Sequence, residues 1–333
     1  MRNISELRQD IASQDWVVIA TGRAKRPHEF LKQKRAPFVQ PRSLCPFEKL
    51  HSDALSVYSK DGERGKENWW VEVIPNKYPA FGKGLCAVFR KVGPYQRTDG
   101  VGFHEVVITR GHERSLAQMS DEEAELMVRA YQDRYLALKD EECVEYISIF
   151  HNHGLLAGAT LSHPHSQIIA IPVIPGDVER SLSGSTRYFH THKTCLGCVV
   201  IRYELKARDR IIYENNDYVV IAPYASKTAF EIRISPKRHN PHFEVMTSQE
   251  RFGFANALRV VLKKLHKGLR NPDYNFFLHT APTGDSKEFR HYHWHLEILP
   301  KTAIWAGFEI GTGIEISTIT PETAAQFLKK IKV

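Results

Sequence analysis

The segment HPHSQ, residues 163–167, carries the side chains best suited to covalent chemistry in this chain. Alternation along a strand would place His163, His165 and Gln167 on one face. The preceding residues 151–162 include two glycines and several small polar residues, and such a loop lets backbone N–H groups approach an anion closely. Because a neutral imidazole can attack phosphorus and then pass the group on, the pattern indicates phosphoryl or nucleotidyl transfer. The alternative, that both histidines are metal ligands or ordinary strand residues, stays open on these residues alone.

A second set of residues has the spacing of a metal site. Cys195-x-x-Cys198, His239 and His293 supply two thiolates and two imidazoles, the ligand set of a closed structural zinc site. The alternatives are a redox-active CxxC or two unpaired cysteines, but no thioredoxin-like strand–helix–strand pattern surrounds the motif. The spacing therefore predicts a zinc ion that pins the two ends of this segment together.

The elements that must position these residues occur twice along the chain. Each copy is predicted to contain two strands, a helix, a third strand and a last strand that opens with His-x-His. His112 lies seven residues before Met119, and His239 lies seven residues before Met246. A capping-box sequence then begins a helix in each copy, with apolar residues at helical spacing behind it. Duplication explains these matches better than chance.

The repeat predicts an α+β fold with two halves, each an antiparallel sheet with a helix, because strands outnumber helices and follow one another at hairpin-like spacing. The first half covers residues 1–175 and the second covers residues 186–333. The stretch 172–185, rich in proline, glycine and serine, is expected to connect them.

The repeat also points to a metal site in the first half. The corresponding residues there are Cys45, Glu48, His112 and His163. A carboxylate in place of a soft thiolate makes the ligand set harder, so we expect weaker zinc binding than in the second half. One or two zinc ions per chain follow from these two sets. In the first half the metal would act indirectly, by fixing His163 and through it the orientation of His165.

Composition limits the class of protein. The 333 residues are 42% hydrophobic and 25% charged, and no apolar run is long enough to span a membrane. The N-terminus lacks the apolar stretch of a signal peptide, so we expect a soluble, cytoplasmic protein. Five scattered cysteines are too few for a disulfide framework, and Cys86 and Cys143 are expected to be small buried residues.

Histidine content and charge both favour phosphate chemistry. Of the 17 histidines, 15 lie between His104 and His295, and such clustering favours catalysis or metal binding. The net charge is +8, and residues 1–42 contribute nine basic and four acidic side chains, or +5. A basic arm can bind nucleic acid, a phosphorylated small molecule or only solvent. No basic run is interleaved with aromatic residues, so we do not expect a nucleic-acid partner.

Several segments together resemble one family. GATLSHPHSQIIA is similar to the active-site motif of the galactose-1-phosphate uridylyltransferases, a branch of the histidine-triad superfamily. Further matches follow in the same order as in that family, and the resemblance spans roughly residues 15–330. They are residues 15–27, IPNKYPAF at 74–81, LHTAP at 278–282, AGFEIGTGIEI at 306–316 and TPETAA at 320–325.

The resemblance implies roles for individual residues. His165 would be the nucleophile that takes the α-phosphate of the nucleotide, and Gln167 would hydrogen-bond the transferred phosphoryl oxygens. Glu309 would contact sugar hydroxyls, across a dimer interface as in the family, which implies a homodimer. Guanidinium groups can bind two phosphate oxygens at once, so the arginines of the basic N-terminus could bind phosphate. The implied phosphate and nucleotide contacts are Arg23, Arg26, Asn76, Asn152 and Thr160.

The resemblance offers a different metal for the second half. Some family members hold iron on a glutamate and three histidines, which here would be Glu179, His279, His293 and His295. That set and the CxxC set both need His293, and we favour the thiolate set because a CxxC beside it would otherwise have no use. Glu297 falls where Gln167 falls in the first copy. Because a carboxylate would repel a phosphate, the second copy is predicted to be non-catalytic.

These observations predict a nucleotidyltransferase that acts on nucleoside diphosphate sugars by double displacement, through a covalent nucleotidyl-histidine. UDP-glucose with galactose 1-phosphate as acceptor is the first expectation. The CxxC and the GFEIGTG loop also resemble the ADP-glucose phosphorylase relatives, which use inorganic phosphate as acceptor. A non-catalytic, zinc-containing protein that binds nucleic acid is the remaining alternative, and it requires His165 to be a structural residue.

Overall fold

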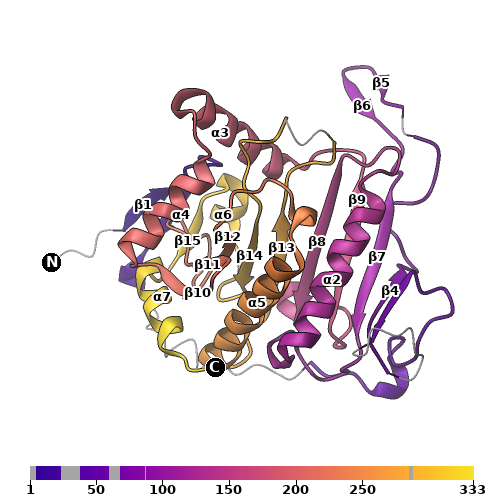
Figure 1. Ribbon diagram of the computed structural model, residues 1–333. Coiled ribbons are helices and arrows are strands. Elements are labelled where there is room, and N and C mark those ends of the chain that lie inside the picture. Colours follow the sequence, from indigo (N-terminus) through magenta and orange to yellow (C-terminus); the bar gives the residue numbers. More distant parts are fainter. Residues whose placement is uncertain (1–4, 24–37, 60–67, 87, 285–287) are drawn as a thin grey trace.

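The computed structural model describes residues 5–23, 38–59, 68–86, 88–284 and 288–333 (Figure 1). Its main feature is one ten-stranded sheet that runs through both halves, and every neighbouring pair of strands in it is antiparallel. The predicted α+β fold with antiparallel sheets is therefore confirmed. In spatial order the strands are β10 (Ile211–Glu214), β11 (Tyr218–Ile221), β12 (Ile232–Pro236), β14 (His295–Pro300), β13 (Tyr274–His279), β8 (Tyr146–His153), β9 (His165–Ile171), β7 (Phe103–Thr109), β4 (Trp69–Pro75) and β3 (Ser56–Ser59).

The two halves meet at strands β8 and β13, which the sequence did not predict to pair. Tyr274 pairs with His153, and Phe277 pairs with Phe150. Each strand is also the neighbour of its own half's His-x-His strand, β9 or β14. Only two strands, β13 and β8, therefore separate the two His-x-His strands in one continuous sheet.

Helices α2 (Asp121–Leu138) and α5 (Ser248–Leu269) lie side by side across one face of the sheet, as Figure 1 shows. Both predicted capping boxes form. The Ser120 hydroxyl accepts from Glu123 N–H while Ser120 N–H donates to the Glu123 carboxylate, and Thr247 makes the same pair with the residue three positions on. The apolar faces of the helices pack against the alternate strand residues, such as Ile147 and Ile168, to make the main core.

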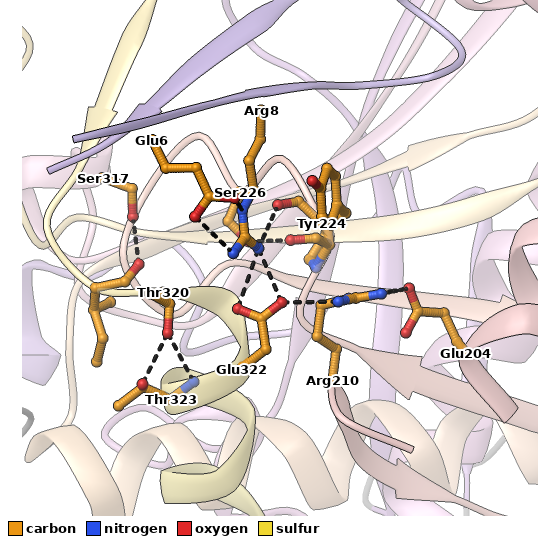
Figure 2. Close-up of polar contacts among 12 residues, drawn as sticks. Glu6, Arg8, Glu204, Arg210, Tyr224, Ser226, Ser317, Thr320, Glu322 and Thr323 are labelled. Carbon is orange, nitrogen blue, oxygen red and sulfur yellow. Dashed lines mark hydrogen bonds and ion pairs between the residues drawn. The ribbon is translucent and has the colours of Figure 1, made fainter. Parts of the chain in front are cut away.

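The N-terminal strands lie against the second half of the chain. β1 (Glu6–Gln9) and β2 (Trp16–Ile19) form a small sheet with β15 (Glu315–Ser317), which runs parallel to β2. Figure 2 shows the ion-pair network beneath it: Arg8 donates to both oxygens of Glu322, at 2.9 and 3.1 Å. Arg210 then joins Glu322 to Glu204, at 2.8 Å to each. The network ties β1 to α7 (Pro321–Lys330), to α4 (Leu196–Ala207) and to Arg210, the residue before β10.

Helix α3 (Gly176–His192) begins within the stretch 172–185 that the sequence predicted to connect the two halves. Acidic residues in its first turn suit the helix dipole, and Val178 and Leu182 bury one side of the helix. Gly184 has a packing role rather than a loop role, because a Cβ there would lie 1.8 Å from the Ala12 carbonyl oxygen.

The expectation that Cys86 and Cys143 are small buried residues is wrong. Cys86 is exposed, and it is joined to Cys143 by a disulfide that the spacing of the cysteines did not reveal. The bridge links the segment before the projecting hairpin of β5 (Arg90–Val92) and β6 (Tyr95–Arg97) to the turn after α2 (Figure 1). Within the described ranges, no helix combines the length and the apolar character needed to cross a bilayer.

Candidate active site and metal-ligand groups

His165 is the first residue of β9, and its side chain lies on the sheet face opposite α2. Ser166 shows this directly, because its hydroxyl contacts Tyr131 of α2 at 2.5 Å and adjacent strand residues point to opposite faces. The Nδ1–H of His165 donates to the His163 carbonyl at 2.8 Å, which leaves the lone pair on Nε2. Burial lowers the pKa of His165, so the ring is neutral near pH 7. A neutral imidazole with an unshared Nε2 has the form that a nucleophile needs.

Gln167 lies two residues along the same face and contacts a histidine to which the sequence assigned no role. The Gln167 Oε1 is 2.7 Å from Nε2 of His104, on the neighbouring strand β7. The same ring nitrogen is 3.0 Å from the Asn76 amide nitrogen, and Ala80 N–H donates to Nδ1 of His104. His104 was missed because its relevance depends on the register of β7 against β9. The only feature of the sequence that could have pointed to His104 is a histidine at the start of an apolar strand.

Asn152 lies near the end of β8, on the same face as His165. Its neighbour His151 pairs with Ser166, which places Asn152 beside His165 across the two strands. The Asn275 side chain, on β13 of the second half, donates to Asn152 Oδ1 at 2.7 Å and to the Ala157 carbonyl at 2.8 Å. The second half therefore holds both Asn152 and the loop that follows it.

The predicted phosphate loop has the backbone that its glycines suggested. Gly154 and Gly158 have φ angles of 84° and 85°, in the region that favours glycine. A Cβ at Gly154 would also lie 2.3 Å from the Asp273 carboxyl group. Thr160 is exposed, and its carbonyl accepts from Gln40 Nε2. A cavity of about 440 Å³ lies beside the loop, lined by residues 151–156 and 161–164 and by Asp273.

The first-half metal group is assembled as the repeat predicted. Atoms of Cys45, Glu48, His112 and His163 lie within 4.8 Å of one another. Both rings donate from Nε2 to backbone carbonyls, those of Gln40 and Thr109, so each Nδ1 faces the centre. Glu48 Oε1 and His112 Nδ1 are 2.5 Å apart, yet both are buried without a hydrogen bond. The donors thus converge on one point, as metal ligands do.

The second-half group repeats this arrangement with two sulfurs. Cys198 Sγ is 3.4 Å from His239 Nδ1 and 3.5 Å from His293 Nδ1, and Cys195 belongs to the same group. Both histidines donate from Nε2 to backbone oxygens at 2.9 Å, of Arg290 and Pro236. Hydrogen bonds from Cys198 and then from the imidazoles lower the pKa of the Cys195 thiol. These residues fit a tetrahedral zinc ion, since thiolate and neutral imidazole are its usual ligands.

The four residues of the iron alternative are not brought together. Glu179 is exposed on α3, and His293 belongs to the cysteine group. His279 and His295 instead form a group with Glu297. Glu297 also accepts from Arg233 at 2.7 Å, and that guanidinium already neutralises its carboxylate.

Three other predicted site residues lie outside the ten-stranded sheet or outside the described residues. Arg23 is the last residue of the short helix η1 (Thr21–Arg23), and Arg26 lies outside the described residues. Glu309 lies on α6 (Gly307–Thr312) of the second half, where its carboxylate caps its own helix by accepting from Ala306 N–H at 3.0 Å. Among the described residues, no recorded contact joins Glu309 to His165.

Comparison with known proteins places this geometry in context. Residues 2–175 match the family described as galactose-1-phosphate uridyl transferase, N-terminal domain, and residues 182–333 match the C-terminal domain of the same description. An ADP-glucose phosphorylase of Arabidopsis thaliana is 33% identical, over 98% of this chain and 93% of its own. A galactose-1-phosphate uridylyltransferase of Thermotoga maritima is 28% identical, over 98% and 99%. A crystal structure of an ADP-glucose phosphorylase from Arabidopsis thaliana, with bound ADP-glucose, superposes with a TM-score of 0.81 at 29% identity, over 99% of this chain and 100% of its own.

Proposed function

Because the chain belongs to the galactose-1-phosphate uridylyltransferase family, we propose that it is a nucleotidyltransferase that acts on nucleoside diphosphate sugars through a covalent nucleotidyl-His165. One observation carries the proposal. His165 is a neutral ring whose Nδ1–H is bound to the His163 carbonyl and whose Nε2 is left for the attack. Gln167 and Asn152 share its face of the sheet, where they can bind the oxygens of the phosphoryl group that is attacked.

The reaction has two displacements. In the first, the Nε2 lone pair of His165 attacks the α-phosphorus, and the new P–N bond forms as the bond from phosphorus to the bridging oxygen breaks. Sugar 1-phosphate leaves with that electron pair. In the second, a phosphate oxygen of the acceptor attacks the same phosphorus, and the P–N bond breaks to restore the neutral ring.

The chain's own donors stabilise the charge that develops in both steps. The hydrogen bond from Nδ1 to the His163 carbonyl supports the positive charge on the ring in the covalent intermediate. Gln167 donates from its amide nitrogen to a non-bridging oxygen, and Asn152 does the same from the adjacent strand. Contacts to the remaining phosphate and nucleotide groups are assigned to Arg23, Arg26, Asn76 and Thr160.

We assign zinc to the two cysteine-containing groups. Cys195, Cys198, His239 and His293 would hold one ion, and the residues of the first-half group, Cys45, Glu48, His112 and His163, would hold a second. Zinc supplies a structural cross-link in such a site. In the first half that link would hold the His163 ring, whose own carbonyl orients His165.

Two donor and acceptor pairs are candidates for the substrates. UDP-glucose with galactose 1-phosphate is supported by the relatives that carry the uridylyltransferase name. ADP-glucose with inorganic phosphate is supported by the CxxC metal group and by the 33% identity to an ADP-glucose phosphorylase. In either case we assign the sugar hydroxyls to Glu309. Among the described residues no contact joins Glu309 to His165 within one chain, so we propose that a second copy supplies this carboxylate and that the protein is a homodimer.

The test is transfer of label to the protein. The purified protein is incubated with UDP-glucose or ADP-glucose labelled at the α-phosphate, and then denatured. We expect acid-labile label on the wild type and on His295→Asn, the second-half counterpart, but none on His165→Asn. The donor that labels the protein identifies the base. If neither donor labels the wild type while the protein binds oligonucleotides in a salt-dependent manner, the non-catalytic alternative replaces this proposal.

A further inference from the structure

His104 lies between the candidate catalytic residue Gln167 and the backbone turn that carries Ala80. It belongs to β7, the strand next to β9, and its ring is half-buried. Its Nε2 is 2.7 Å from Gln167 Oε1, and its Nδ1 is 3.1 Å from the Ala80 nitrogen. Nδ1 thus has one close polar partner, whereas Nε2 also lies 3.0 Å from the Asn76 amide nitrogen, and the chemistry of these partners decides where the ring proton lies.

The Ala80 contact fixes the tautomer. A backbone N–H can only donate, so Nδ1 of His104 must accept and carries no hydrogen. The ring proton is therefore on Nε2, and it donates to the nearby oxygen of Gln167. The Asn76 amide nitrogen lies 3.0 Å from the same Nε2, but it cannot accept this proton, because an amide nitrogen only donates and Asn76 Oδ1 is already held by Tyr78 N–H.

The donor on His104 decides which end of the Gln167 amide faces the substrate. An amide has an oxygen at one end and an NH₂ group at the other, and the two orientations differ by a flip. With its oxygen held by His104, Gln167 must present the NH₂ group to a phosphoryl oxygen beside His165. After a flip, the carbonyl oxygen would face the phosphate and repel it.

We propose that His104 is a positioning residue that holds the Gln167 amide with its NH₂ group toward the transferred phosphoryl group. The inference rests on the proposed nucleotidyl transfer and adds a residue that does not itself touch the substrate. The second half supports it by contrast. Glu231, which immediately precedes β12, takes the place of His104 there, and a carboxylate stands in the place of Gln167, so neither position offers a fixed amide.

Three substitutions of His104 distinguish its two possible roles, which are to position Gln167 and to hold the turn that carries Ala80. His104→Gln puts an amide NH₂ near the position of Nε2, and so keeps a donor for Gln167. His104→Asn puts an acceptor near the position of Nδ1, and so keeps the Ala80 contact but loses the donor. His104→Phe loses both. We expect kcat to fall less than about 5-fold for His104→Gln and about 10- to 100-fold for the other two, with KM little changed, because the hydrogen bond acts on the developing charge.

A double-mutant cycle gives the second readout. If His104 acts only through Gln167, His104→Phe costs nothing further in a Gln167→Ala background. Additive losses, or an activity order in which His104→Asn exceeds His104→Gln, would overturn the positioning role and leave the transfer reaction intact. Absence of α-phosphate label on the wild type would overturn the proposed function and this inference together. Thermal unfolding of each variant is compared first, and the cycle is measured on those that melt with the wild type.

Discussion

At four equivalent positions of their sheets, the two halves of this chain carry the same side chain once and different side chains three times. In each half one strand, β9 or β14, begins at the second histidine of His-x-His, and this histidine donates from Nδ1 to the carbonyl of the first, at 2.8 Å in one half and 3.2 Å in the other. The backbone frame is thus shared, and only the groups on it differ. The pairs, first half before second, are Asn152 and His279, His165 and His295, Gln167 and Glu297, and His104 and Glu231.

The two sites differ in whether the charges of their side chains are neutralised by other side chains of the same site. In the second half Arg233 donates to Glu297, and Asp10 lies 3.6 Å from the same guanidinium. Burial opposes the ionised form of Glu297, but Arg233 and the two imidazoles outweigh it and hold the pKa of this carboxyl well below its ordinary value. The first-half site contains neutral donors and no carboxylate at these positions. The second half therefore pairs its charged side chains with one another, whereas the first half has hydrogen-bond donors that can bind an anion.

Exchanging the residue at the Gln167 position gives the largest expected effect. Gln167→Glu introduces the second half's carboxylate, which repels the phosphoryl oxygens and has no N–H to donate. We expect the rate of transfer to fall about 1,000-fold, or about 4 kcal/mol of transition-state stabilisation, in steady-state kinetics.

The reciprocal variant is the control for that exchange. Glu297→Gln is expected to leave transfer within about 3-fold of the wild type and to lower thermal stability instead, because the buried Arg233 loses its anionic partner. A large loss of activity in Glu297→Gln would show that the second site takes part in the reaction, and the comparison of the halves would fail.

One carboxyl group of the second half is expected to make stability depend on pH, and its position in the first half carries no titratable side chain. Glu244 lies five residues after His239, where the first half has Ala117 five residues after His112. Burial raises the pKa of Glu244 to about 7, and its Oε2 has no hydrogen-bond partner. The folded protein thus binds this proton more tightly than the unfolded chain, so stability falls as pH rises from about 4.5 through 7. The loss is about 2 to 3 kcal/mol.

Glu244→Gln should remove that slope. The variant is expected to exceed the wild type in free energy of unfolding at pH 8.5 by about 2 kcal/mol more than at pH 5, as measured by urea denaturation. Glu145→Gln, at an exposed carboxylate, is the matched control and should show no such difference. Equal stability differences at both pH values would mean that Glu244 is not protonated in the folded state.

The sequence was sufficient for those parts of the structure that depend on local order. Capping boxes at Ser120 and Thr247 located helices α2 and α5, and the spacing of Cys195 and Cys198 from distant histidines predicted a group of side chains that could hold a metal ion and that the fold brings together. The parts it missed depend on register and on close approach. His104 became relevant only once β7 was aligned with β9, and Gly184 lies in helix α3, where the Ala12 carbonyl oxygen comes too close to leave room for a Cβ. Neither contact produces a periodic pattern of residue types in the sequence.

The two groups of candidate metal ligands also differ between the halves, at one ligand position. Exchanging the residue at that position is expected to have a smaller effect than the exchange at Gln167. Glu48→Cys would give the first half the two thiolates of the second, and we expect about 10-fold tighter zinc binding there, since softer ligands favour zinc. Cys198→Glu is the reciprocal variant and should weaken the second site by a similar factor. Chelator competition followed by elemental analysis measures both. Identical affinities for wild type and Glu48→Cys would exclude Glu48 from the ligand set.

The smallest expected effect tests the contact between the halves. Asn275 belongs to the second half, yet it donates to Asn152 and to the Ala157 carbonyl of the first-half loop. Asn275→Ala removes both bonds while leaving Asn152 in place, so we expect kcat to fall about 3- to 10-fold. Hydrogen exchange at residues 154–160 should become faster in the same variant.

Asn256→Ala is the matched control for Asn275→Ala, because this asparagine bonds Tyr213 and Asp121, away from the loop. It should change neither kcat nor exchange at residues 154–160. If Asn275→Ala behaves in the same way as this control, the second half does not support the loop through that side chain. Its contribution would then reduce to the pairing of β13 with β8, and a carboxamide at position 275 would matter only for packing. If the loop loosens but kcat is unchanged, the position of Asn152 does not limit the rate of transfer.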